Sequence, residues 1–161
     1  MTHHDCDICI IGGGSGGLSL AAGAAQLGAK IVLFEASKMG GDCLNSGCVP
    51  SKALLAAAKA AHHAKGAASM GIHGSSPKID FAAVKAHLAA VIDGIAPHDS
   101  VERFESLGVT VISEHASFTG RREVSSKNHT VRAKYFVIAT GSQPAIPPID
   151  GLADTDFHTN E

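Results

Sequence analysis

The chain has 161 residues, of which 45% are hydrophobic and 17% are charged, and its formal net charge at pH 7 is −2. A chain of this size can bury one hydrophobic core, and its near-neutral charge excludes a strongly basic nucleic-acid-binding face or a disordered acidic chain. No stretch approaches the ~20 apolar residues of a membrane span, and no basic region followed by an apolar run opens the sequence. We therefore expect a cytoplasmic protein that contacts neither nucleic acid nor membrane.

The first predicted elements are a strand, a glycine-rich turn and a helix. Residues 7–11 are mostly apolar, and Gly12, Gly14 and Gly17 then fill a G-x-G-x-x-G pattern ahead of an alanine-rich stretch over residues 18–25. In this motif the first glycine makes the tight turn, the second admits a pyrophosphate and the third lets helix and strand pack closely. The helix N-terminus then stabilises the negative charge. The residues expected to bind the cofactor here are Gly12, Gly14, Ser15, Gly16 and Gly17.

A second predicted strand over residues 30–34 ends in Glu35, eighteen residues after Gly17. An acidic residue at this place accepts hydrogen bonds from a ribose. A lone glycine pattern would be weak evidence, because glycine-rich turns also serve only as turns. Strand, turn, helix, strand and acid in this order predict a dinucleotide-binding unit.

The next feature is a pair of cysteines, Cys43 and Cys48, five positions apart. On an uninterrupted helix the two would lie too far apart to bridge, because a disulfide needs Cα atoms roughly 4.4–6.8 Å apart. The intervening residues 45–47 (Asn-Ser-Gly) relax the backbone, and Pro50 suits the first turn of a following helix. Cys48 would then lie near a helix N-terminus, which favours its thiolate. The block predicts a redox-active dithiol; the alternative is a structural disulfide or two unrelated buried thiols.

Two helices are expected after the dithiol. An alanine-rich helix over residues 53–68 ends at Gly71, and Asp80 is expected to cap a second helix over 81–96. Pro97 should kink or restart that helix.

Strands dominate the rest of the chain. The continuation after the second helix should end at Gly108, ahead of a parallel strand over 109–112. Residues 114–132 alternate in short pieces and predict a three-stranded antiparallel meander. An apolar strand over 135–138 follows, and the prolines between 144 and 148 predict an extended exit.

The remaining cysteines and the ten histidines do not predict a metal site. Cys6 and Cys9 have C-x-x-C spacing, but odd spacing in a strand predicts that their side chains face opposite sides of the sheet. His3 with His4, and His62 with His63, are adjacent pairs, whereas metal ligands on a helix favour spacings of three or four. In a reducing compartment, four cysteines are better explained by catalysis than by a disulfide scaffold.

These motifs together resemble the flavoprotein pyridine nucleotide–disulfide oxidoreductases, the family of dihydrolipoamide dehydrogenase, glutathione reductase and mercuric reductase. The resemblance rests on the glycine turn, Glu35, the block 40–52, and Ala139-Thr140-Gly141 after the strand over 135–138. The dithiol favours FAD over a nicotinamide in this turn, because a flavin performs the two-electron opening of a disulfide. The implied fold is an α/β Rossmann-like FAD-binding domain with a parallel sheet, flanking helices and a three-stranded antiparallel β-meander covering one face.

The resemblance also implies roles for individual residues. Cys48 would lie against the flavin and contact it as a charge-transfer thiolate, Cys43 would be the interchange thiol, and the Lys52 ammonium would stabilise negative charge on the reduced ring. Asp42 stands where many relatives carry threonine, and its charge could disfavour a neighbouring thiolate or reach the cofactor phosphates through water. The expected catalytic residues are Cys43, Cys48 and Lys52. The other expected FAD contacts after Glu35 are Gly41, Asp42, the main chain of His115 and Ala116, and Ala139, Thr140 and Gly141.

The implied activity belongs to a larger enzyme. NAD(P)H would reduce FAD, FAD would open the Cys43–Cys48 bridge, and Cys43 would pass electrons to a small-molecule disulfide, lipoamide or a metal ion. Family enzymes are longer and homodimeric, so we expect residues 1–150 to be the first segment of the FAD-binding domain. Residues 151–161 would begin the connection to an NAD(P)-binding domain, and the fragment alone would be inactive. From another class, the chain could be a non-catalytic flavin- or nucleotide-binding module with a regulatory thiol switch.

Overall fold

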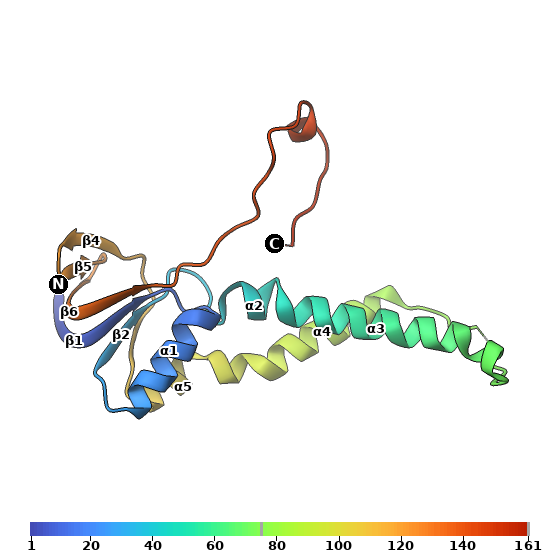
Figure 1. Ribbon diagram of the computed structural model, residues 1–161, viewed down its shortest axis with the longest axis horizontal. Coiled ribbons are helices and arrows are strands. Elements are labelled where there is room, and N and C mark those ends of the chain that lie inside the picture. The colour runs from blue at the N-terminus through green and yellow to red at the C-terminus, as the bar shows by residue number, and fades with distance from the viewer. Residues whose placement is uncertain (75, 161) are drawn as a thin grey trace.

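The computed structural model describes residues 1–74 and 76–160, which fold as a mixed sheet flanked by helices (Figure 1). The sheet has six strands in the order β3-β2-β1-β6-β5-β4. The strands are β1 (Thr2–Ile11), β2 (Ile31–Phe34), β3 (Thr110–Ile112), β4 (Ser117–Gly120), β5 (Glu123–Ser125) and β6 (His129–Ile138). The α-helices are α1 (Ser15–Gln26), α2 (Gly41–Asn45), α3 (Cys48–Gly66), α4 (Phe81–Ile95) and α5 (Val101–Ser106), and short 3-10 turns cover Ala67–Met70, Ala96–Asp99 and Leu152–Asp154.

The parallel half of the sheet confirms the predicted α/β architecture. β1 lies at its centre and pairs in parallel with β2 and with β6, while β2 pairs in parallel with β3. β1 begins at Thr2, five residues earlier than the apolar run alone predicted. The strand, turn, helix and strand that the sequence predicted at the N-terminus are β1, α1 and β2.

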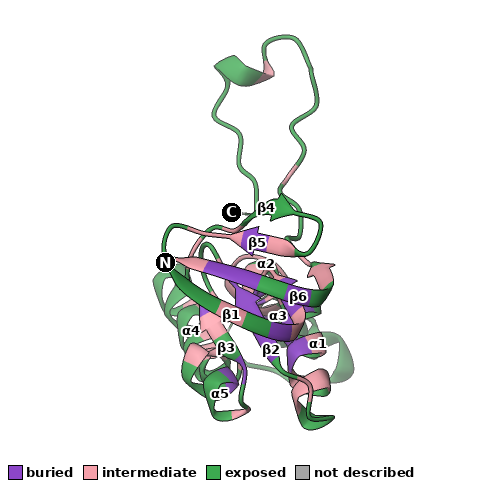
Figure 2. Ribbon diagram, turned by 90° about the vertical axis from the view of Figure 1, so that its left-hand side faces the viewer, coloured by how far each residue is buried: buried purple, intermediate pink, exposed green. Residues whose placement is uncertain are grey.

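The antiparallel meander is also confirmed, with one difference in how it ends. β4 pairs with β5, and β5 pairs with β6, both antiparallel. The strand predicted over 135–138 is not separate, because β6 runs without interruption from His129 to Ile138. The same strand thus closes the meander and pairs with β1, so the meander continues the sheet at one edge (Figure 2).

Two clusters of buried side chains lie on the two faces of the sheet. β2 shows the division, because Ile31 and Leu33 belong to the cluster under α1 and α5, while Val32 and Phe34 belong to the other. Burial on both faces explains why this strand is apolar at every position. The second cluster also includes Val124 and Val131 of the meander. The meander therefore covers one face, as expected, while remaining hydrogen-bonded to the sheet.

The expectation that Cys6 and Cys9 face opposite sides of the sheet is wrong. Both are buried in the same cluster, because the strand is irregular between them. The N–H groups of Asp7 and Ile8 both donate to the carbonyl of Lys30, at 2.8 and 3.2 Å, and two consecutive donors on one acceptor interrupt the alternation of side chains.

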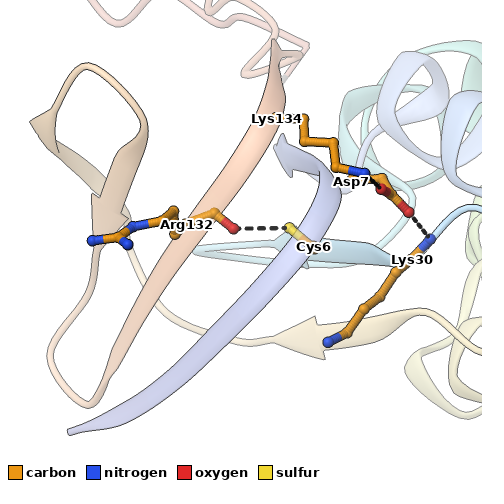
Figure 3. A network of polar contacts seen from close by, with 5 residues as sticks. All are labelled: Cys6, Asp7, Lys30, Arg132 and Lys134. Carbon is orange, nitrogen blue, oxygen red and sulfur yellow. Dashed lines mark hydrogen bonds and ion pairs between the residues drawn. The ribbon is translucent and has the colours of Figure 1, made fainter.

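Asp7 occupies this irregular point. Its carboxylate accepts the Lys30 N–H at 2.9 Å and forms an ion pair with the Lys134 ammonium of β6 at 2.6 Å (Figure 3). The hydrogen bond from Lys134 holds the pKa of Asp7 below its usual value. Both side chains remain partly exposed, so the ion pair itself contributes little to stability.

The helical boundaries follow the predicted caps. The carboxylate of Asp80 accepts the Ala83 N–H at 3.1 Å at the start of α4, and Gly71 ends the first helical stretch with a φ of +80°. α3 and α4 lie side by side and extend away from the sheet (Figure 1). Among the described residues, no helix is both long enough and apolar enough to span a bilayer.

A histidine pair joins the two central strands. The Nε2 atom of His4 on β1 lies 3.0 Å from the Nδ1 atom of His129 on β6, and this hydrogen bond needs at least one neutral ring. Burial lowers the pKa of His4, and the nearby His129, Lys30 and His3 lower it further.

We predict that the free energy of unfolding decreases as the pH falls below the pKa of a histidine in the unfolded chain. The folded state favours neutral His4, so its contribution is complete above about pH 6.5 and is lost as the pH falls toward the lower folded pKa. His4→Gln should make the dependence between about pH 7.5 and about pH 5.5 shallower, as measured by urea unfolding. His73→Gln, at an exposed position, is the control and should leave the slope unchanged.

A second prediction concerns two glycines of α1. A Cβ at Gly17 would lie 1.9 Å from the Gly12 carbonyl oxygen, whereas one at Gly23 meets nothing within 4 Å. Gly17→Ala should lower the free energy of unfolding by about 1–3 kcal/mol through overpacking. Gly23→Ala should raise it by about 0.5–1 kcal/mol, because glycine is unfavourable inside a helix. Equal effects of the two substitutions would contradict this packing.

Candidate active site

A cleft of about 870 Å³ opens where the three central parallel strands end. The chain enters it at Gly12 after β1, at Glu35 after β2 and at Ala139 after β6. Ligands of open α/β sheets bind at this place, beyond the carboxyl ends of the strands. The volume lies within the roughly 300–1,000 Å³ of small-molecule and cofactor sites.

The glycines of the turn differ in why no side chain is present: packing within the chain requires glycine at Gly12, whereas Gly14 and Gly16 border open space. Gly12 has a φ of +112°, and a Cβ there would lie 2.2 Å from the Ala139 carbonyl oxygen, so chain packing alone requires glycine. At Gly14 a Cβ would make only an ordinary contact at 3.7 Å, and at Gly16 it would meet nothing within 4 Å. Both line the cleft. The open space above them lies at the N-terminus of α1, where backbone N–H groups and the helix dipole favour an anionic group.

Glu35 is held in place by the backbone on either side. Its two carboxylate oxygens accept the N–H groups of Gly13 and Ser37, each at 2.6 Å. A carboxylate has about four lone-pair sites, so it can still accept bonds from ribose hydroxyls. The structure therefore places an oriented acceptor on the cleft wall.

The dithiol segment is fixed directly to the glycine turn. The Gly40 N–H donates to the Gly13 carbonyl at 2.8 Å, and Gly14 and Gly40 form a parallel bridge. Gly41 has a φ of +56°, and a Cβ there would lie 2.8 Å from the Gly14 Cα. Gly41 and Asn45 are the first and last residues of α2, and the Asn45 side chain donates to the Gly41 carbonyl at 2.8 Å. One rigid junction thus holds the turn and the dithiol on the same cleft.

The backbone between the two cysteines breaks as expected. α2 ends at Asn45, the Gly47 N–H donates to the Asp42 carbonyl at 2.6 Å, and α3 begins at Cys48. Both cysteines are free thiols, Cys43 half-buried and Cys48 exposed. Cys48 thus lies at the N-terminus of a long helix, as the sequence predicted.

The surroundings of Cys43 raise the pKa of its thiol. Hydrogen bonding with the Cys48 side chain is the largest cause, burial and the charge of Cys48 raise it further, and the ammonium of Lys52 opposes the rise. The Cys43 thiol therefore keeps its proton to a higher pH than an ordinary cysteine does.

The structure brings most of the predicted cofactor residues together on the cleft wall. Those that line it are Gly12, Gly14, Ser15, Gly16, Glu35, Gly41, Asp42, Cys43, Cys48, Ala139, Thr140 and Gly141. Gly17 instead lies buried under the turn. Lys52 is exposed on α3 outside the cleft. His115 and Ala116 follow β3 and do not line it; His115 is exposed, and Ala116 packs against the core.

Sequence reasoning missed five residues that line the cleft. They are Ser37, Lys38, Asn45, Ser46 and Ser142. Each lies within three positions of a residue that was predicted, so proximity in sequence was the available signal. Among the described residues there is no group of three or more histidine, cysteine or acidic side chains placed to hold a metal ion.

Comparisons with known proteins identify the family of the chain. The family model described as pyridine nucleotide-disulphide oxidoreductase matches residues 6–161. A mercuric reductase of Streptomyces lividans is 36% identical over 99% of this chain and 35% of its own length. A dihydrolipoyl dehydrogenase of Thermus scotoductus is 38% identical over 91% of this chain and 31% of its own length. The chain therefore spans about a third of the length of the curated relatives that it matches.

A solved structure shares the fold. The HOCl-induced flavoprotein disulfide reductase RclA from Escherichia coli, in a Cu(II) complex, superposes with a TM-score of 0.70 and 26% sequence identity. The match covers 92% of this chain and 31% of the reductase chain.

We predict that thiol reagents distinguish the four cysteines of the folded chain. Burial raises the pKa of Cys9 to about 12 from 9.0, which reduces its thiolate fraction ~1000-fold. Iodoacetamide should therefore modify Cys43 and Cys48 long before Cys6 and Cys9, as resolved by peptide mass spectrometry. Rapid modification of Cys9 in the folded protein would contradict the buried position of its side chain.

Proposed function

Because this chain belongs to the pyridine nucleotide-disulphide oxidoreductase family, we propose that it is the FAD-binding part of an NAD(P)H-dependent reductase with a Cys43–Cys48 redox pair. Members of the family are FAD-dependent and take electrons from NAD(P)H. One observation carries the proposal for this chain: the Gly13–Gly40 hydrogen bond holds the dithiol beside a glycine turn that is open to a dinucleotide. Since the chain spans a third of its relatives, the activity of a whole enzyme is part of the proposal.

The residues of the cleft fit FAD. Gly14 and Gly16 leave room for the pyrophosphate at the start of α1, Glu35 accepts from the ribose, and Thr140 with Gly141 borders the opposite wall. When bound, FAD supplies the two-electron chemistry that connects a nicotinamide to a disulfide. Lys52, His115 and Ala116 remain proposals of the family resemblance, with Lys52 contributing its charge to the dithiol from outside the cleft.

The disulfide form of the pair can take up one hydride equivalent without other reactants. Two electrons and one proton convert the disulfide into one thiol and one thiolate. A hydrogen bond from the thiol would then stabilise the neighbouring thiolate. Cys48, the exposed sulfur on the cleft, would exchange electrons with the cofactor. Cys43 would attack the substrate as a thiolate after it loses its proton.

The substrate is proposed from two relatives of nearly equal similarity. One is named mercuric reductase and the other dihydrolipoyl dehydrogenase, at 36% and 38% identity. Turnover of Hg(II) against lipoamide by the complete gene product would separate the two, and inertness toward both would argue against each.

We predict that Gly14→Ala separates folding from cofactor binding. Gly14 has a φ of −85°, which any residue adopts, and the added methyl would meet no clash within the chain. The free energy of unfolding should therefore change by less than about 1 kcal/mol. Affinity for FAD should fall at least about tenfold, because the methyl occupies the phosphate cradle, as measured by quenching of flavin fluorescence. Unchanged affinity would place the cofactor elsewhere.

We also predict that Cys48→Ser abolishes turnover by the complete gene product while leaving bound flavin in place. Cys43→Ser should do the same, because either change leaves a single sulfur that cannot form the disulfide. Steady-state NAD(P)H oxidation and the flavin absorbance measure the two effects. Full activity of Cys48→Ser would support a non-catalytic module with a thiol switch instead.

We further propose a cytoplasmic homodimer. The hairpin of α3 and α4 carries exposed apolar side chains, among them Leu55 at 67% and Phe81 at 62% exposure, which a partner could cover. Light scattering of the complete gene product tests this, with a monomer as the contradicting result.

A further inference from the structure

Cys43 lines two cavities, and Cys48 lines only one of them. Besides the cleft, Cys43 lines a smaller cavity of about 300 Å³ between α1 and the segment from Asp99 to Phe104. Its walls carry Ser15 and Ser19 from α1, and two charged residues, Asp99 and Arg103. The two sulfurs of the dithiol therefore have different electrostatic surroundings.

The chain that carries Asp99 is firmly anchored. Phe104, at 1% exposure, is buried in the core cluster under α5. The Arg103 guanidinium donates to the His98 carbonyl at 2.8 Å, and the Ser100 hydroxyl accepts the Arg103 N–H at 3.2 Å. The fold thus fixes the position of Asp99 on the cavity wall.

The charged groups around Cys43 come from four elements. They are Asp42 of α2, Cys48 and Lys52 of α3, Asp99 of the turn Ala96–Asp99, and Arg103 of α5. α1 contributes only serine and apolar side chains, and α4 contributes to neither cavity. Within the described ranges, no hydrogen bond or ion pair engages the Asp99 carboxylate, so its charge is not neutralised by a direct partner.

We propose that Asp99 is a positioning residue for the dithiol: from the cavity that it shares with Cys43, its carboxylate favours the protonated Cys43 thiol over the thiolate. This deepens the proposed function and rests on it. Removal of one proton from the dithiol gives one thiol and one thiolate, and a nearby like charge disfavours the thiolate on the sulfur that it faces. The effect of Asp99 adds to those of the Cys48 hydrogen bond and burial on the Cys43 pKa.

For the reaction, this means that Cys43 stays protonated until a base removes its proton. Together with the Cys48 side chain and burial, Asp99 therefore raises the pH at which Cys43 begins to react with a substrate.

The test is the pH dependence of alkylation at each cysteine of the reduced, full 161-residue chain. Iodoacetamide rates are measured from about pH 6 to about pH 10, with Cys43 and Cys48 resolved by mass spectrometry. Asp99→Asn should lower the pH midpoint of Cys43 alkylation by about half a unit. Below the midpoint, the reaction should then be roughly threefold faster than in the wild type. Asp99→Glu, which keeps the charge, should restore the midpoint toward wild type.

Glu105→Gln is the matched control. It removes one negative charge from α5 at an exposed position that does not line the cavity, and it should leave the Cys43 midpoint unchanged. An unchanged midpoint in folded Asp99→Asn, or an equal shift in Glu105→Gln, would overturn the assignment. Asp99→Ser provides a second neutral variant in case the asparagine variant does not fold.

The outcome is distinguishable from failure of the proposed function. If Asp99→Asn leaves the pH midpoint of Cys43 alkylation unchanged while Cys48→Ser abolishes turnover, only the role of Asp99 fails. If the midpoint moves as expected but Cys48→Ser retains turnover, the electrostatic assignment stands and the catalytic role of the dithiol fails.

Discussion

A Cβ atom at Gly12 would lie 2.2 Å from the Ala139 carbonyl oxygen, and one at Gly17 would lie 1.9 Å from the Gly12 carbonyl oxygen. At both places the backbone approaches too closely for any side chain, and the Ala139 N–H donates to the Ile11 carbonyl at 2.8 Å, which joins the ends of β1 and β6. The Gly13 carbonyl then accepts the Gly40 N–H and adds the dithiol segment to the same junction. The strand ends and the dithiol segment are therefore positioned relative to one short turn, and Gly12 and Gly17 are the positions in it where no side chain fits.

The site built on this junction is electrostatically uneven. The N-terminus of α1 is open to an anion, while Glu35 on the next strand is already oriented by two backbone donors. At the dithiol, Lys52 favours the Cys43 thiolate and Asp99 disfavours it. Cys48 lines only the cleft, whereas Cys43 also lines the smaller cavity beside Asp99. The two sulfurs therefore have different electrostatic surroundings before any ligand binds.

The sequence predicted features that depend on local chemistry and missed those that depend on other strands. The glycine turn, the broken helix between Cys43 and Cys48, and the Asp80 cap were predictable because each requirement is met within a few residues. The shared face of Cys6 and Cys9 was not, because the interruption at Asp7 requires the Lys30 carbonyl and the Lys134 ammonium of neighbouring strands. The positions of Lys52 and His115 outside the cleft likewise depend on how distant elements pack. The roles of the cleft residues toward a cofactor remain predictions.

The pairing of β1 with β6 has a consequence for how the chain is made. Thr2 pairs with His129 and Ile11 with Ile138, so the residues that pair between these two strands are 127 positions apart. Strands that pair across such distances close late and slowly, because a long loop must be ordered first. During synthesis the ribosome must release residue 138 before β1 acquires its second neighbour. Until then β1, α1 and β2 form a half-covered unit with an open strand edge, the part of the nascent chain most exposed to aggregation.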